Sequence, residues 1–562
     1  MMMRYTKWTS SGRPWIWLNA AAIAISILMV VGLVSLLAVR GLSYFWPSDV
    51  MQARYSSSDS DGSELSMQVV GEVVDIESVP SSQVIAAGID VPANQELIQR
   101  ILLKQGNREF FNEDFIWLLD NSIEDIQYPP ELVALERQEW GDFYGKLHQL
   151  KENGIVVGSA DNSEAVRWSE FLARLERVYS IRVQIAEIEK AEIQGINYRT
   201  NQLRVDVREL EISGDMTEKR RQQLAIQRQF LQSEYEIQRQ KLVRLNDQIM
   251  RDDAEFIIAG GEIVAIKFAA IVRAYRPNQL STVGKFKVFL SKLGEFLSAE
   301  PREANTEGGV FPAIFGTVMM VLLMSVFVTP FGVVAAVYLR EYAKQGITTK
   351  IIRISVNNLA GVPSIVYGVF GLGFFIYIIG GEIDQLFYSE ALPAPTFGTP
   401  GLLWASLTLA LLTLPVVIVA TEEGLARIPR SVREASLALG ATKFETLWRV
   451  VLPMASPAMM TGLILAVARA AGEVAPLMLV GVVKLAPSLP LDGNYPYLHL
   501  DQKFMHLGFH IYDVGFQSSN IEAAKPLVFA TAFLLVAVIA TLNLSAVSLR
   551  NHLREKYKSL EA

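Results

Sequence analysis

The chain of 562 residues contains no cysteine. This absence excludes disulfide bonds, thiolate nucleophiles and metal sites that depend on cysteine. Histidine is also scarce, with five residues in the whole chain. None of them has a metal-binding spacing on a predicted helix, and we expect His506 and His510, four residues apart in a predicted loop, to lie at the surface. The sequence therefore predicts no metal site.

A nucleotide-binding loop is absent as well. The pattern G-x-x-x-x-G-K-[ST], whose backbone amides hold phosphates, does not occur. Gly284-Lys285 lacks both the preceding glycine and the following Ser or Thr. Nothing in the sequence therefore indicates that the chain hydrolyses ATP itself, and we predict no catalytic residues and no cofactor bound by this chain. The sequence also shows no feature of a nucleic-acid-binding protein.

Apolar residues make up 51% of the chain, and the mean hydropathy is +0.27. The average hides a division, because residues 40–305 have the composition of a soluble domain while the rest is strongly apolar. This combination is typical of a membrane protein with one large domain outside the bilayer. The net charge of −7 averages over both parts and indicates little about partners.

Six apolar runs are long enough to cross a bilayer as helices of about 20 residues. The first run is too long for the apolar core of a cleaved signal peptide, so we expect it to remain as a span. The six runs cover residues 15–39, 310–339, 359–379, 402–420, 454–483 and 526–549.

Lysine and arginine are distributed unevenly between the segments that connect these runs. They are scarce in residues 380–401 and 484–525 and concentrate in residues 1–14, 340–353, 427–449 and 550–562. Cytoplasmic segments of membrane proteins carry this excess. We therefore predict an all-α polytopic membrane protein with six transmembrane helices, a cytoplasmic N-terminus at residues 1–14 and a cytoplasmic tail at residues 550–562.

Residues 40–304 contain no span and are predicted to form one large periplasmic insertion. Alternating apolar and polar residues predict strands at 67–76 and 84–91, and residues 256–272 predict two strands around a Gly-Gly turn. These strands indicate a β-rich base. An amphipathic stretch at 287–296 is expected to lie along the membrane surface.

Proline is absent from residues 163–252. Heptad spacing there predicts a long antiparallel coiled-coil hairpin with arms of about 50 and 35 residues. Ser213-Gly214-Asp215 is predicted to supply the turn and an N-cap, and Gly195 a kink in the longer arm. The hairpin is either a rigid spacer or an arm that docks another protein. The heptad positions of the second arm are Leu231, Tyr235, Leu242, Leu245 and Ile249.

A regularly spaced motif lies between the fourth and fifth spans. It reads Glu434-Ala435-Ser436, three residues, Gly440, nine residues, then Val450-Val451-Leu452-Pro453. The pattern predicts a helix over 431–439 that stops at Gly440 in a left-handed conformation, and a second turn over 444–451 that ends at Pro453. An incidental amphipathic loop is the alternative interpretation.

This spacing resembles the "EAA" loop of the permeases of bacterial ABC importers. Ser436 stands where a second alanine is usual, and Val450 where isoleucine is usual. The resemblance implies the type I ABC importer permease fold, with residues 305–549 as the core. It also implies that the loop at residues 422–453 docks on a separate ATPase subunit through Glu434, Ala435, Ser436, Gly440, Val450, Leu452 and Pro453.

Four further segments resemble the phosphate-importer permease of the PstA type. They are residues 305–309, 358–368, 420–423 and 468–477, with Val474 where threonine is common. The resemblance covers about residues 305–554 and does not extend to residues 50–290. It implies phosphate as substrate, a location in the bacterial inner membrane among its lipids, and three protein partners. These are a paralogous permease, a pair of ATPase subunits that bind ATP and magnesium, and a periplasmic phosphate-binding protein.

Two charged residues occur within the fifth predicted span. Arg469 and Glu473 are four residues apart, so on a helix they can pair with each other. Charges at membrane depth are costly and face a bundle interior or a water-filled path. Arginine suits phosphate because its planar fork donates two parallel hydrogen bonds. We expect Arg469 to meet the substrate and Glu473 to hold Arg469 between transport events; a structural ion pair is the alternative.

Other residues are candidates for a gate or for helix packing. Glu422 and Glu423 lie at the cytoplasmic end of the fourth predicted span, where solvated helix-end acids are the simpler interpretation. Gly361, Gly368, Gly371 and Gly373 would permit close helix packing in the third span. Pro363, followed by Ser364, is expected to kink that span.

Two other functions remain open at the level of sequence. One is a permease for another oxyanion, such as phosphonate or molybdate, although the residues of the fifth span argue against it. The other is a membrane sensor whose periplasmic hairpin relays a signal. A sensor of that kind needs a cytoplasmic output domain, and no predicted cytoplasmic segment is long enough to form one.

Overall fold

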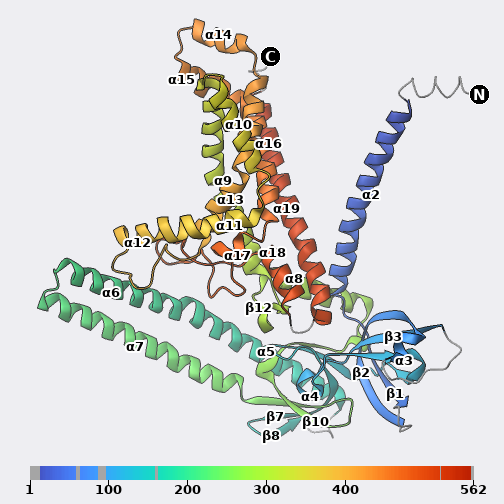
Figure 1. Cartoon of the computed structure of the whole chain (residues 1–562). Helices are drawn as coiled ribbons and strands as arrows, with labels where there is room; N and C mark the ends of the chain where they lie inside the picture. Colours follow the sequence, from blue (N-terminus) through green and yellow to red (C-terminus); the bar gives the residue numbers. More distant parts are fainter. Residues whose placement is uncertain (1–12, 59–63, 87–95, 159–162, 519–520, 558–562) are drawn as a thin grey trace, which may run out of the picture.

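The computed structural model describes residues 13–58, 64–86, 96–158, 163–518 and 521–557. Within these residues six helices are long and apolar enough to cross a membrane. Figure 1 shows one end of the spans carrying the short helices α14 and α15, and the opposite end meeting the β-sheets. We call these ends the loop side and the sheet side. The described beginning of α2 and end of α19 both lie on the loop side, as an even number of spans requires.

The spans agree with the predicted number and order. Several extend beyond the predicted ends, because a helix continues into polar residues that hydropathy does not count as membrane. Their bounds are α2 (Arg13–Ser43), α9 (Phe311–Val337), α11 (Ser364–Phe370) with its continuation to Phe387, α13 (Leu402–Arg427), α16 (Leu452–Ala471) and α19 (Ile521–Tyr557).

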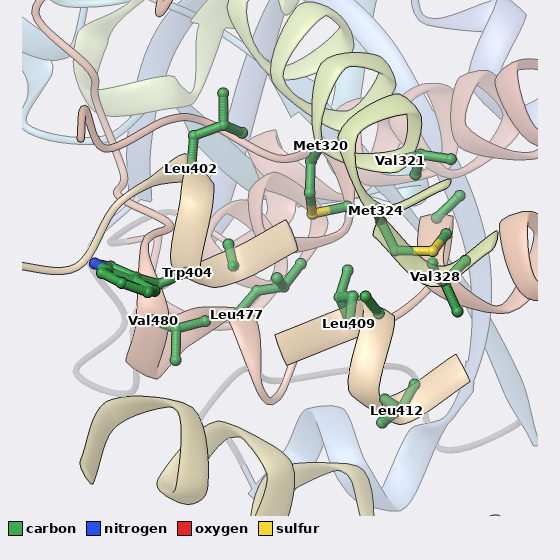
Figure 2. Packing of buried hydrophobic residues seen from close by; sticks show 14 of the residues in the cluster. Met320, Val321, Met324, Val328, Leu402, Trp404, Leu409, Leu412, Leu477 and Val480 are labelled. Carbon is green, nitrogen blue, oxygen red and sulfur yellow. The ribbon is translucent and has the colours of Figure 1, made fainter. Parts of the chain in front are cut away.

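Helix α13 is the centre of the bundle. In its most apolar window 67% of the residues are buried, whereas in α2 none is, so α2 stands at the periphery. Figure 2 shows methionine and valine side chains of α9 packing against leucines of α13, with Leu477 and Val480 of α17 (Leu477–Val480) beside them. Because lipid tails are as apolar as these side chains, the close van der Waals packing, and not removal from water, stabilises the bundle.

The third span begins later than predicted. Helix α10 (Ile347–Leu359) ends before a turn at residues 360–363, and α11 then continues through the π-helical segment η7 (Gly371–Gly380) into α12 (Gly381–Phe387). Pro363 is the N-cap of α11 with φ −54°, so the predicted kink inside the span is wrong. Proline disfavours helix at the residue before it, which makes this the natural place for the span to begin.

The fifth span is interrupted. The π-helical turn η8 (Leu447–Val451) leads directly into α16, and Pro453 lies in its first positions, where a missing N–H is tolerated. The predicted stop at Pro453 is therefore wrong. The span ends instead at Ala471, before Gly472, and α17 follows as a separate helix after Pro476. Glycine and proline both disfavour helix, which explains the break.

Two antiparallel sheets form the base of the insertion. The first has the order β4-β3-β2-β1-β5 and the second the order β10-β9-β7-β6-β11, with β8 beside β7. The strands of the first are β1 (Val50–Ser58), β2 (Glu64–Pro80), β3 (Leu97–Lys104), β4 (Phe115–Leu119) and β5 (Ile123–Gln127). The strands of the second are β6 (Leu132–Arg137), β7 (Phe143–Glu152), β8 (Ile155–Gly158), β9 (Asp252–Ile257), β10 (Ile263–Lys267) and β11 (Ile271–Tyr275).

The predicted strands have mixed outcomes. Residues 67–76 lie in β2, and 256–272 contain β10 with the adjoining ends of β9 and β11. The prediction at 84–91 is wrong where it can be judged, since residues up to 86 belong to the short helix α3 (Ser81–Ala86). Residues 87–91 lie outside the described part of the chain. Short apolar runs do not distinguish helix from strand.

The helical hairpin leaves the second sheet between β8 and β9. Its first arm is α5 (Glu164–Glu187), the π-helical turn η2 (Ile188–Ile193) and α6 (Gln194–Ser213), and its second arm is α7 (Glu218–Ile249). The arms pack antiparallel (Figure 1). The irregular turn precedes Gly195, which itself is helical. Thr217, rather than Asp215, caps α7, since its side chain accepts a hydrogen bond from the Arg220 N–H at 3.4 Å.

The hairpin lies along the sheet side of the membrane core. Figure 1 shows α6 and α7 running beneath α12 and the long connection that precedes α18 (Leu507–Phe516). The Tyr198 hydroxyl of α6 donates a hydrogen bond to the backbone carbonyl of Tyr495 in that connection. Helix α8 (Thr282–Ser298), which contains the predicted amphipathic stretch, joins the insertion to α9.

The expectation that His506 and His510 lie at the surface is wrong. Both are almost fully buried at the start of α18. His506 Nδ1 accepts a hydrogen bond from the Gly508 N–H at 3.1 Å and so caps the helix. Burial lowers the pKa of each imidazole to about 4, so both are neutral at pH 7. A hydropathy pattern cannot show this burial because neighbouring spans provide it.

Candidate coupling and translocation sites

The loop between α13 and α16 is built from two short helices. Helix α14 (Arg430–Ala438) ends before Gly440, whose φ of +86° is left-handed, as predicted. Helix α15 (Lys443–Thr446) follows, with a capping box formed by Thr442 and Glu445. The Ser436 and Thr446 hydroxyls share a hydrogen bond of 2.9 Å that joins the helices. Serine at this position therefore has a structural use that alanine would lack.

Two cations of this loop bind the π-helical turn η6 (Tyr338–Tyr342), which continues α9. The Arg433 guanidinium donates to the carbonyls of Leu425 and Ile428 at 2.8 and 2.7 Å, and it pairs with Glu341 at 2.8 Å. Lys443 donates to the Glu341 carbonyl at 2.6 Å and lies over the Tyr342 ring. Because Leu425 belongs to α13, a displacement of the loop would be transmitted to both central spans.

The loop also exposes a group of apolar side chains that was not predicted. We call Leu437, Leu439, Phe444 and Trp448 the coupling patch. Leu439 is 90% exposed, and the rings of Phe444 and Trp448 are stacked with centroids 6.3 Å apart. Exposed apolar patches with polar surroundings mark protein-interaction sites. The signal in the sequence was the i, i+4 spacing of the two aromatic residues.

The predicted coupling residues separate into two groups. Glu434, Ala435 and Gly440 are exposed on the loop. The other group is partly buried, and its apolar members lie at the start of the membrane helix. It consists of Ser436, Val450, Leu452 and Pro453.

Glu422 and Glu423 lie near the end of α13, which continues to Arg427. They line a cavity of about 240 Å³ between α9, α10 and α13. Arg353 of α10 pairs with Glu422 at 2.6 Å, so Glu422 is not the solvated acid expected, whereas Glu423 is exposed. This pair links α10 to the loop-side end of α13.

The Arg469–Glu473 pair lies at the helix break on the sheet side. Arg469 is in the last turn of α16, and Glu473 follows the end of the helix. Arg469 Nε and Glu473 Oε1 are 3.5 Å apart, and the side chains remain 34% and 21% exposed. The predicted pairing is confirmed. The two residues do not lie on one regular helix, however, because α16 ends at Ala471, between them. Irregular backbone in a membrane bundle is tolerated where it lines a cavity or is buried in protein.

The break is packed tightly against the third span at only two of the four predicted glycines. A Cβ at Gly368 would lie 2.7 Å from Cα of Pro476, and one at Gly371 would lie 2.9 Å from the Val480 side chain. By contrast, Gly373 has open space, and Gly361 lies in the turn before α11, where a Cβ would only touch the Asn358 carbonyl. Ser364 begins α11 and is partly buried.

Comparison with known proteins decides the family. Residues 328–559 match the family described as binding-protein-dependent transport system inner membrane component. The phosphate transport system permease protein PstA 1 of Mycobacterium tuberculosis (strain CDC 1551 / Oshkosh) is 36% identical over 247 residues, which are 43% of this chain and 71% of that protein. The chain belongs to the family of binding-protein-dependent transport system inner membrane components.

Further relatives agree with this assignment. The phosphate transport system permease protein PstA of Mycobacterium leprae (strain TN) is 37% identical over 194 residues, 34% of this chain and 58% of that protein. A solved structure of the MetNI methionine ABC transporter has 20% identity and covers 44% of this chain and 94% of its own, but its TM-score of 0.31 is too low to support an argument. The permease is a transporter component and not an enzyme, so the sensor interpretation is set aside.

Proposed function

We propose that this permease forms half of the translocation pathway of an ATP-driven importer of inorganic phosphate. The observation that supports this most directly is the partly exposed Arg469–Glu473 pair at a helix break, in a chain whose relatives are named phosphate transport permeases. A partly exposed charge pair inside a membrane bundle requires water, a substrate or a further protein surface to satisfy it.

The geometry of the pair suits a binding site that must also release its ligand. A guanidinium has five N–H donors, and the single 3.5 Å contact with Glu473 leaves most of them available. Phosphate can therefore bind the fork of Arg469 through two parallel hydrogen bonds while Glu473 moves aside. When phosphate leaves, Glu473 again compensates the charge. In this account Arg469 binds the substrate and Glu473 is a positioning residue.

Coupling to ATP hydrolysis is assigned to the loop side. The coupling patch, with Glu434, Ala435 and Gly440 exposed beside it, would dock on a separate ATPase subunit. That subunit, present as a pair, would hold ATP and magnesium. Arg433 and Lys443 would then transmit its movement to α9 and α13 through the contacts with Glu341 and the end of α13.

The remaining partners follow from the arrangement of the spans. A paralogous permease would cover the exposed side of Arg469 and complete the pathway, and a periplasmic phosphate-binding protein would deliver the substrate. The excess of basic residues on the loop side supports placing that side in the cytoplasm of a bacterial inner membrane, with the sheets and hairpin in the periplasm. In this account the hairpin packs as a coiled coil and serves as a rigid arm.

Substitution of Arg469 tests the substrate contact. Arg469→Ala should reduce labelled-phosphate uptake by at least 10-fold, and Arg469→Lys should also be impaired, because lysine keeps the charge but loses the fork. Arg554→Ala, an exposed arginine near the end of α19 and outside the coupling loop, is the matched control and should transport normally. All variants are compared at equal amounts in the membrane. Normal uptake by Arg469→Ala would show that the pair only stabilises packing.

A further inference from the structure

A second polar site shares no lining residue with the coupling loop or with Arg469. A cavity of about 590 Å³ opens where the sheet-side ends of α2 and α19 meet the first sheet and α8. Figure 1 shows these four parts converging between the membrane core and the insertion. The cavity is therefore at the boundary between the bilayer and the sheet-side solvent.

The deep wall of this cavity carries more negative than positive charge. Glu136 pairs with Arg273 and Lys292 at 2.6 and 2.8 Å. Glu295 pairs with Arg273 and Arg302, both at 2.7 Å, and Asp142 pairs with Lys104. Two more carboxylates line the cavity, Glu72 and Glu307, and neither forms an ion pair within the described part of the chain. These five carboxylates face four cations, so this part of the lining is one positive charge short, whereas the lining as a whole has seven acidic and seven basic side chains.

The pKa values of the two unpaired acids agree with this imbalance. Burial, reinforced by the neighbouring Asp142, raises the pKa of Glu307 to about 8. Burial also raises the pKa of Glu72. A buried carboxyl whose ionisation is disfavoured gains stability from an added cation nearby. A ligand with a positive group at this depth would therefore be bound favourably.

The mouth of the cavity has the opposite character. Arg40, in the last turn of α2, and Lys525, near the start of α19, are both exposed, and neither has an ion-pair partner among the described residues. Trp46 lies on the same wall and is 39% exposed. The acids of the rim are Asp75 and Glu77, and Glu77 pairs with Arg100 at 2.7 Å. Arginine, lysine and tryptophan are the residues that occupy the headgroup level of membranes.

Apolar surface continues from the mouth toward the bilayer. Helices α2 and α19 touch at Gly41, where a Cβ would lie 2.7 Å from Cα of Ala530. Beyond this contact α2 diverges from α19 toward the loop side (Figure 1), and no residue in its most apolar window is buried. Acyl chains can therefore lie along α2 while their headgroup enters the cavity.

We propose that this cavity binds the headgroup of phosphatidylethanolamine, with the phosphate at Arg40 and Lys525 and the ammonium group toward Glu72 and Glu307. The bound lipid would join α2, α19, α8 and the first sheet, and so fix the insertion on the membrane core. A soluble phosphate ester with an ammonium group, such as phosphoethanolamine, has the same charges. The apolar surface of α2 favours the lipid.

Native mass spectrometry of the detergent-solubilised full chain can test this assignment. We expect phosphatidylethanolamine to be retained at least 10-fold more than phosphatidylcholine, whose methylated ammonium donates no hydrogen bonds, or phosphatidylglycerol, which has no ammonium. The Glu72→Gln/Glu307→Gln variant should lose this preference. The Arg40→Ala/Lys525→Ala variant should retain less of all three lipids. Lys287→Ala, an exposed lysine of α8 that does not line the cavity, is the control.

Three results would overturn the proposal. The first is equal retention of the three lipids by the unaltered chain. The second is a preference for phosphatidylethanolamine that persists in the Glu72→Gln/Glu307→Gln variant. The third is displacement of the lipid by equimolar phosphoethanolamine, which would assign the cavity to a soluble ligand. Thermal unfolding of each variant identifies any that is misfolded, and Glu307→Gln alone, which keeps the side-chain volume, then serves as the second test.

Discussion

Arg433 contributes more to the loop than the sequence motif alone indicates. It is only 18% exposed, and its guanidinium reaches Glu341 of the second span and two carbonyls at the end of α13. Partly buried pairs of this kind cost about 3 kcal/mol when one partner is removed, because the other charge is left without compensation. The pair is therefore a rigid link between the loop and the spans.

Removing this link should uncouple the loop from the bundle. We expect Arg433→Ala to reduce phosphate uptake at least 10-fold while the chain remains in the membrane, and Glu341→Gln to have a smaller effect because the carbonyl contacts of Arg433 persist. Arg554→Ala, an exposed arginine near the end of α19, is the control. Normal phosphate uptake by Arg433→Ala would contradict this role.

Sequence reasoning at the scale of residues succeeded where a charge stood out from its surroundings. Arg469 and Glu473 are conspicuous in an apolar stretch, and the structure pairs them. Sequence reasoning did not predict ion-pair partners that come from distant parts of the chain. Glu341 lies 92 positions before Arg433, and nothing in the local pattern connects them.

At the scale of elements, close packing joins the third span to the break after α16. The Gly368 backbone meets Pro476, and Gly371 lies beside Val480 of α17. A Cβ at Gly368 would have to displace the backbone of Pro476, whereas one at Gly371 would meet the side chains of Thr408 and Val480. Overpacking of this kind costs about 1–3 kcal/mol.

Gly368→Ala should therefore lower the thermal unfolding temperature of the detergent-solubilised permease by several degrees. Gly373→Ala is the matched control, since it lies in the same span with no atom within 4 Å of an added Cβ. It should be neutral or slightly stabilising, because alanine favours helix over glycine. Equal unfolding temperatures for Gly368→Ala and the unaltered chain would show that the contact with Pro476 is not tight.

The spans illustrate what hydropathy can predict. Their number and order followed from the apolar runs, because a bilayer requires about 20 such residues per helix. The turn at residues 360–363 and the break after Ala471 occur inside apolar runs. Hydropathy alone therefore did not predict them. Gly361, Pro363, Gly472 and Pro476 carried the missing signal, but glycine and proline are common in membrane helices and do not mark breaks by themselves.

At the scale of the whole molecule, the insertion is arranged around the sheet side of the bundle. The second sheet was predictable only in part, since β7 pairs with β9 across the entire hairpin, and such long-range pairing leaves no local pattern. The hairpin itself was predictable, because long stretches without proline and with regular apolar spacing have few alternatives. Its contact with the connection before α18, through Tyr198 and Tyr495, was not.

Uptake of labelled phosphate tests the central claim most directly. It is measured in cells that lack this chain and other phosphate importers, with the unaltered chain restored or withheld, and with excess molybdate or phosphonate as competitor. We predict uptake only when the chain is restored, and little competition from either oxyanion. Uptake that is the same with and without the chain, or that molybdate or phosphonate abolishes, would contradict its assignment as a phosphate permease.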